Sequence, residues 1–129
     1  MAHTTCLAGL DPTAVPTLNA ALKGAGVLER PDFAALDVRD IGKLRPDLLV
    51  CDVDGFAIDR LELLRRLRFV LPDCLIAVYT RDMHRAWSLA CHLAGANCML
   101  SKDSNEADLA YGMRDALDSG CFTDPRFSA

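Results

Sequence analysis

The chain has 129 residues, of which 51% are hydrophobic and 25% are charged, and this composition is that of a globular protein rather than a disordered one. A chain of this length buries one hydrophobic core, so we expect a single domain over residues 1–129. The net charge of −4 argues against direct binding of nucleic acid, because contacts to a phosphate backbone need clustered lysine and arginine.

Short apolar runs alternate with amphipathic stretches along the chain, as strands alternate with helices in a parallel sheet. Residues 4–10 are predicted to form a first strand, which ends at Asp11. A helix is predicted over residues 13–24. Residues 33–37 are a candidate second strand, and only a short helix fits between them and Pro46.

The second half of the chain shows the alternation more clearly. Further strands are predicted at residues 47–51, 74–79 and 98–100, and further helices at 59–71, 83–94 and 105–119. Asp103 or Ser104 is expected to cap the last helix at its start, and Gly120 to end it. The whole pattern predicts an α/β fold with a five-stranded parallel doubly wound sheet, in which right-handed crossovers place helices on both faces.

Two helices carry surface features that have more than one interpretation. Four arginines fall on the polar side of the helix over residues 59–71, and we expect a solvated face, with a docking patch as the alternative: Arg60, Arg65, Arg66 and Arg68. The buried side of that helix is predicted to consist of Leu61, Leu64, Leu67 and Leu71. On the helix over residues 83–94, Trp87, Ala90 and Ala94 form a face that is either partly exposed for association or packed in the core.

The cysteines and the apolar runs indicate a cytoplasmic protein. None of the six cysteines forms a C-x-x-C pair, and most lie in apolar runs, so we expect reduced core thiols. No charged and then apolar leader opens the chain, and no apolar run approaches the roughly 20 residues that cross a bilayer. The histidines are too scattered to predict a zinc site.

Polar residues stand where the predicted strands end. Asp11 follows the first strand, Asp52 and Asp54 follow the third, Thr80 ends the fourth, and Lys102 follows the fifth. In a doubly wound sheet the ligand site lies at the carboxyl ends of the strands. An aspartate, a hydroxyl and a lysine suit phosphoryl chemistry there, because a carboxylate can attack phosphorus while an ammonium and a hydroxyl hold the phosphoryl oxygens.

Two families of proteins carry out phosphoryl chemistry with a buried strand that ends in an aspartate, as the strand before Asp52 does. Residues 52–55 match the D-x-D-G segment of haloacid-dehalogenase-type phosphatases, but those enzymes carry it on an early strand and add an acidic motif on a later one. Here about fifty residues and a strand precede Asp52, and no strand is predicted after Lys102 to present another acidic pair. A phosphatase is therefore a remote alternative.

The other match extends over nearly the whole chain. RPDLLVCD at residues 45–52 resembles the P-D-x-x-x-x-D segment of response-regulator receiver domains, and LPDCLIAVYT at 71–80 ends in their switch hydroxyl. LAGANCMLSKD at 93–103 resembles their G-A-x-x-x-L-x-K segment. The tail ALDSGCFTDPRF at 116–127 looks like the end of receivers that precede a helix-turn-helix output domain. We expect either a stand-alone receiver or part of a longer regulator.

This resemblance implies the flavodoxin-like receiver fold and a phosphorylation switch. A histidine kinase or a phosphotransfer protein would donate the phosphoryl group, Asp52 would accept it, and Thr80 and Lys102 would engage it. A downstream protein or an output domain would read the change on the surface of the fourth helix, the fifth strand and the fifth helix, and a homodimer is a further option. The resemblance implies no direct nucleic-acid partner, no membrane partner and no metabolic substrate for this domain.

The match to receivers breaks at the acidic pair that usually holds magnesium. Its two positions fall on Gly9 and Leu10, and Asp11 lies one place later. Asp54 stands where receivers contribute a backbone carbonyl to the metal. We therefore hypothesise a Mg²⁺ site of Asp11, Asp52 and Asp54, because hard cations need convergent anionic oxygens. The alternative is that Asp54 only favours the turn that follows it.

Other departures keep two functional hypotheses open. Phe56 replaces a proline after the phosphoacceptor, Arg81 replaces a small residue after the switch hydroxyl, and Met99 replaces an aromatic residue. One hypothesis is a working phosphoacceptor with a rearranged metal site. The other is a phosphorylation-independent pseudo-receiver that binds a partner or dimerises, in which Asp52 and Lys102 persist as a charge pair that is costly to break from one side.

Overall fold

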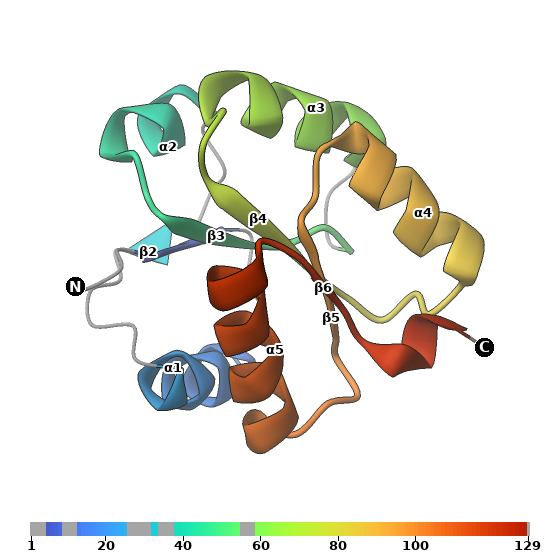
Figure 1. The fold of residues 1–129 in the computed structure, drawn as a ribbon. Helices are drawn as coiled ribbons and strands as arrows, with labels where there is room; N and C mark the ends of the chain where they lie inside the picture. Colours follow the sequence, from blue (N-terminus) through green and yellow to red (C-terminus); the bar gives the residue numbers. More distant parts are fainter. Residues whose placement is uncertain (1–4, 9–12, 26–31, 34–37, 55–58, 129) are drawn as a thin grey trace.

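The computed structural model describes residues 5–8, 13–25, 32–33, 38–54 and 59–128, and a parallel β-sheet forms its centre (Figure 1). The strands are β1 (Thr5–Ala8), β2 (Asp32–Phe33), β3 (Leu48–Asp52), β4 (Leu75–Thr80), β5 (Cys98–Ser101) and β6 (Phe122–Thr123). They lie in the order β2-β1-β3-β4-β5-β6, and every pairing is parallel. The predicted parallel sheet of five strands is confirmed, and a sixth short strand extends it.

Helices cover both faces of this sheet. Figure 1 shows α2 (Val38–Leu44), α3 (Arg60–Val70) and α4 (Arg85–Ala94) on one face, with α1 (Val15–Gly24) and α5 (Glu106–Ser119) on the other. Each helical layer encloses its own hydrophobic cluster against the sheet. The predicted doubly wound α/β fold is therefore confirmed.

The central strands are apolar on both faces because both faces are covered. β3 is buried at every position and pairs on both sides, with Leu49 opposite Cys6 of β1 and Ile76 of β4. Burial on both faces explains why its sequence is an unbroken apolar run rather than an alternating one. At one edge of the sheet, β2 has only 2 residues. The helix that follows it, α2, has 7 residues, so the prediction of a short helix before Pro46 is confirmed.

The start of the last helix differs from the prediction. Asn105, and not Asp103 or Ser104, caps α5, and its side chain accepts a hydrogen bond from the backbone N–H of Asp108 at 2.8 Å. The hydroxyl of Ser104 instead donates to the buried carboxylate of Asp124 at 2.7 Å. Ser104 is thus engaged by the chain that follows α5, which a local capping rule does not take into account.

The segment after α5 forms structure that the sequence did not predict. β6 pairs with β5, with Phe122 opposite Cys98, and the 3₁₀ helix η1 (Pro125–Ser128) buries Phe127 to 1% exposure in the cluster beside α4. The expectation that no strand follows Lys102 is therefore wrong. A strand of 2 residues has no hydrophobic periodicity to detect, so only its pairing reveals it.

The arginines of α3 do not form one solvated face. Arg65 and Arg66 are exposed, as predicted, but Arg68 donates to the backbone carbonyls of Cys74 at 2.8 Å and of Gly95 at 2.7 Å. The guanidinium of Arg60 lies 3.9 Å from the ring centroid of Trp87 on α4. Half of the cluster therefore connects α3 to other elements.

The apolar residues of α3 differ from the prediction in detail, and those of α4 decide between the two interpretations left open. Leu63 belongs to the buried side of α3, whereas Leu61 is only half-buried. On α4, the core interpretation is confirmed for Ala94, and Trp87 is half-buried and packs against the same core. The exposed large apolar residues of α4 are Leu89 and Leu93, and Leu93 is 90% exposed.

The thiols behave as predicted. Within the described residues no disulfide forms, and all the cysteines except Cys121 are buried. Burial raises the pKa of Cys51, Cys74 and Cys91 to about 12, so these side chains stay protonated and unreactive near neutral pH. No helix in the described part of the chain combines the length and apolar character needed to cross a bilayer.

Candidate functional site

Three predicted site residues meet at the carboxyl end of the sheet. Asp52 is the last residue of β3, Thr80 is the last residue of β4, and Lys102 directly follows β5. The strands are parallel neighbours in register, and the backbone N–H of Lys102 donates to the carbonyl of Thr80 at 3.0 Å. Consecutive parallel pairing therefore brings together residues that are far apart in the sequence.

Asp52 and Lys102 form a charge pair at the base of this site. The Lys102 ammonium lies 2.9 Å from Oδ2 and 3.0 Å from Oδ1 of Asp52. Asp52 is 3% exposed, so its negative charge depends on this cation and on the backbone N–H of Asp54, which donates to Oδ1 at 3.0 Å. A buried carboxylate held by one lysine is suitably placed to act as a nucleophile toward an electrophile that enters above it.

Asp54 lies two residues after the end of β3, and its side chain points into the site. Oδ1 accepts a hydrogen bond from the hydroxyl of Thr80 at 2.6 Å, and Oδ2 accepts one from the backbone N–H of Arg81 at 2.8 Å. Lys102 Nζ lies 3.0 Å from the same Oδ2. Asp54 therefore does more than favour a turn, because it binds donors from the ends of both β4 and β5.

The electrostatics of the site follow from these contacts. Burial acts to raise the pKa of Asp54, but the hydrogen bonds from Thr80 and Arg81, together with Lys102, lower it below its ordinary value of 3.8. Burial acts to lower the pKa of Lys102, but its contacts with Asp52 and Asp54 raise it above 10.5. The carboxylate of Asp54 and the ammonium of Lys102 are therefore held in their charged forms at neutral pH.

The described residues do not fit a magnesium ion as they are arranged. Asp11 lies outside the described residues, and within those residues no cluster of three histidine, cysteine or acidic side chains could hold a metal. The carboxylate oxygens of Asp52 and Asp54 all accept from N–H or O–H groups, and Lys102 lies between the two side chains. A divalent cation needs oxygens that are not already paired with an ammonium.

Arg60 is a member of the site that the sequence did not reveal. Its guanidinium lies 3.9 Å from Asp54 Oδ1 and 3.9 Å from Asp82 Oδ2, and it also stacks on Trp87. An arginine at the first turn of a helix carries no signal that distinguishes this role from solvent exposure, because the helical period places only its Cβ. Arg60 connects the site to α4.

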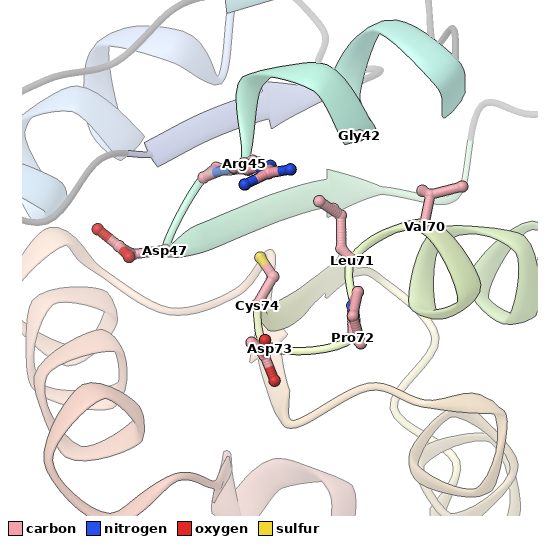
Figure 2. Close-up of a pocket in the computed structure, with 9 residues that line it drawn as sticks. Gly42, Arg45, Asp47, Val70, Leu71, Pro72, Asp73 and Cys74 are labelled. Carbon is pink, nitrogen blue, oxygen red and sulfur yellow. The ribbon is translucent and has the colours of Figure 1, made fainter.

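A cavity of about 480 Å³ lies at the opposite end of the sheet (Figure 2). Asp47 and Cys74, which line it, directly precede β3 and β4, whereas Asp52 and Thr80 end those strands. Asp52, Thr80 and Lys102 do not line this cavity. It is therefore separate from the candidate site.

Comparison with known proteins agrees with this fold. No family model matches the chain. Over 88 residues it is 36% identical to the methanol utilization control regulatory protein MoxX of Paracoccus denitrificans, a match that covers 65% of this chain and 39% of that protein. The chain thus spans about two fifths of the length of the curated relative that it matches.

Solved structures show the same fold. The isolated receiver domain of RcsB from Salmonella enterica serovar Typhimurium, determined with the phosphomimetic BeF₃⁻, matches with a TM-score of 0.83 at 18% identity, over 99% of this chain and 97% of that one. A LuxR-family two-component response regulator from an Aurantimonas species matches with a TM-score of 0.78 at 20% identity, over 99% of this chain and 94% of that one.

The chain has the fold of response-regulator receiver domains, and over 88 residues its sequence is similar to that of a regulatory protein. The solved structures that share this fold include a response regulator of the LuxR family.

Proposed function

We propose that this receiver accepts a phosphoryl group on Asp52 from the phosphohistidine of a histidine kinase or phosphotransfer protein. The observation that carries the proposal is the contact of 2.9 Å between Lys102 and Asp52, with Thr80 at the end of the strand between them. A carboxylate oxygen of Asp52 forms a bond to phosphorus, the N–P bond of the phosphohistidine breaks, and the imidazole keeps the electron pair and takes up a proton. The domain would thus act on itself rather than on a metabolic substrate.

Lys102 and Thr80 have complementary roles in this reaction. The ammonium of Lys102 neutralises charge on the phosphoryl oxygens, and the hydroxyl of Thr80 donates a hydrogen bond to one of them. Thr80 is fully buried and its oxygen also accepts from the backbone N–H of Asp82 at 3.1 Å, which orients its proton toward the site.

The surface proposed to transmit the change includes β6, which the resemblance did not imply. β5 does not offer an open edge, because β6 pairs with it. The exposed apolar side chains nearby are Leu89 and Leu93 on α4 and Tyr111 on α5. The proposed contact surface for a downstream protein, an output domain or a second copy of the chain therefore consists of α4 and α5 with β6 between them.

A magnesium site of Asp11, Asp52 and Asp54 stays a prediction. It requires Asp54 to exchange the Thr80 hydroxyl and the Arg81 amide for the metal. A cytoplasmic location is likewise part of the proposal, and it is supported by the buried thiols, which suit a reducing compartment.

The alternative is a receiver that acts without phosphorylation, and a specific observation favours it. The donors that would hold a phosphoryl group are already bound by Asp54. In that case the site is a structural cluster, and α4 and α5 serve binding or dimerisation directly.

The phosphatase alternative has no comparable support. Asp124 is an acidic residue after a late strand, as such enzymes require, but it follows β6 at the sheet edge. Its carboxylate is held by Ser104 and by Arg126, whose Nη1 lies 3.2 Å away.

Intact mass spectrometry distinguishes the two main functions. The protein is incubated with acetyl phosphate, with and without magnesium, alongside Asp52→Asn and the matched control Asp82→Asn. We expect wild type and Asp82→Asn to gain one phosphoryl group and Asp52→Asn to gain none. The absence of any gain in folded wild-type protein would refute the phosphoacceptor function and favour the phosphorylation-independent one.

A further inference from the structure

The donors around Asp54 form a site for an anion. A hydroxyl from Thr80, a backbone amide from Arg81 and an ammonium from Lys102 all lie within 3.0 Å of one carboxylate. These groups come from the ends of two neighbouring strands, so the sheet holds them in fixed positions. Convergent N–H and O–H donors with one formal positive charge bind anions in general, and a phosphoryl group or a carboxylate can fill such a site.

Asp54 and a phosphoryl group on Asp52 would need the same donors. Lys102 Nζ lies 2.9 Å from Asp52 Oδ2 and 3.0 Å from Asp54 Oδ2, so one ammonium already serves both side chains. Asp54 is two residues from Asp52 and its backbone N–H is bound to the Asp52 carboxylate. This attachment gives Asp54 a high effective concentration at the anion site, which no free anion has.

We propose that Asp54 is a built-in competitor that fills the anion site of this receiver, so that phosphorylation of Asp52 requires the Asp54 carboxylate to withdraw. The inference rests on the proposed function, because it concerns the regulation of the same site. A bound internal carboxylate keeps Thr80 and Lys102 in place without phosphate, and it reduces the fraction of molecules that can take up a phosphoryl group.

Arg60 can pair with the carboxylate of Asp54 after that carboxylate leaves the anion site. It also lies next to Trp87, whose fluorescence can be measured. Its guanidinium is already 3.9 Å from Asp54 and sits over the ring of Trp87, the single tryptophan of the chain. Withdrawal of Asp54 from Thr80 toward Arg60 changes the charge next to this ring. The fluorescence of Trp87 therefore reports on the occupancy of the anion site.

The test measures binding of inorganic phosphate to wild type, Asp54→Ala and Asp54→Asn in magnesium-free buffer, by Trp87 fluorescence and by the amide chemical shift of Arg81. Asp82→Ala is the matched control, because it removes a carboxylate at the same distance from Arg60 that does not touch the anion donors. We expect phosphate to bind at least about 10-fold more tightly to both Asp54 variants than to wild type and Asp82→Ala. Phosphorylation by acetyl phosphate should accelerate by a similar factor.

The outcomes separate this inference from the proposed function. Tighter phosphate binding without phosphorylation of any variant supports the competitor and refutes the phosphoacceptor. Phosphorylation of wild type at the rate of the Asp54 variants, with no gain in phosphate binding, overturns the competitor and leaves the phosphoacceptor intact. Loss of magnesium-dependent phosphorylation in both Asp54 variants, again without a gain in phosphate binding, also overturns it, because Asp54 then acts as a metal ligand. Asp54→Asn keeps the size of the side chain and one acceptor oxygen for Thr80 or Arg81, so it keeps the test valid if Asp54→Ala does not fold.

Discussion

Two partly buried cations stand at opposite ends of the sheet, and their partners differ in kind. At the carboxyl end, Lys102 is held by the carboxylates of Asp52 and Asp54. At the amino end, Arg68 donates to the side chain of Asn97 and to backbone carbonyls at the end of α3, before β4 and at the end of α4. These carbonyls belong to Leu71, Pro72, Cys74 and Gly95. One cation is neutralised by charges, and the other is solvated by neutral oxygens.

This difference separates a region whose contacts can change with chemistry from a region whose contacts cannot. The partners of Lys102 can gain a proton, form a covalent bond or exchange places, so the arrangement around it responds to chemistry. The carbonyl partners of Arg68 belong to the backbone and do not titrate. The fork of a guanidinium satisfies several such acceptors at once, which an ammonium does not do as well. Arg68 therefore fastens α3 and α4 to the sheet.

The largest effect is expected when the lysine is replaced by methionine. Lys102→Met leaves Asp52 buried and without its cation, and we expect the free energy of unfolding to fall by about 3 kcal/mol. Urea denaturation at pH 7 measures this loss. Adding Asp52→Asn to the variant should recover part of it, because the unpaired charge disappears. If Lys102→Met alone were as stable as wild type, the charges at this site would be well solvated, and the proposed difference between the two cations would be wrong.

Replacing Arg68 by methionine should lower the free energy of unfolding by less than replacing Lys102 does. Arg68→Met leaves several carbonyl oxygens without a donor, but these are neutral and part-exposed, so we expect a loss of about 2 kcal/mol in the same measurement. Arg68→Lys should remain closer to the methionine variant than to wild type, because one ammonium does not reach all the acceptors. Full stability of Arg68→Lys would show that charge, and not fork geometry, is what this end requires.

The smallest effect is a dependence on pH that only the carboxyl end should show. The pKa of Asp54 in the folded protein lies below its ordinary value of 3.8, so its contribution is complete above that value and is lost as the pH falls through the lowered pKa. We expect wild type to exceed Asp54→Asn by about 1 kcal/mol or less at pH 7, and this margin to vanish on acidification toward pH 2.

The control for this prediction is the other cation. The partners of Arg68 are carbonyl and amide oxygens, which do not titrate. Titration of these partners should therefore not change the difference in free energy of unfolding between wild type and Arg68→Met as the pH varies. Urea denaturation at a series of pH values measures both margins. Equal pH dependence at the two ends of the sheet would contradict the assignment of the switchable end.

The sequence by itself determined the fold and the meeting of Asp52, Thr80 and Lys102. Alternating apolar runs and amphipathic stretches define strands and helices, and right-handed crossovers leave few ways to order consecutive parallel strands. Residues that end neighbouring parallel strands then share one edge of the sheet. The physical reason is that backbone pairing depends on periodicity over many residues, which a single sequence displays.

Only the tertiary structure decided which groups the long and terminal side chains reach. Asp54 could equally have faced solvent, a metal or the donors of Thr80 and Arg81, because a residue in a turn has no periodic environment to direct it. Arg60 and Arg68 share a helix with solvated arginines, and the helical period does not specify where a guanidinium several bonds from the backbone ends. The pairing of β6 with β5 likewise depends on contacts across the sheet edge, which no local pattern encodes.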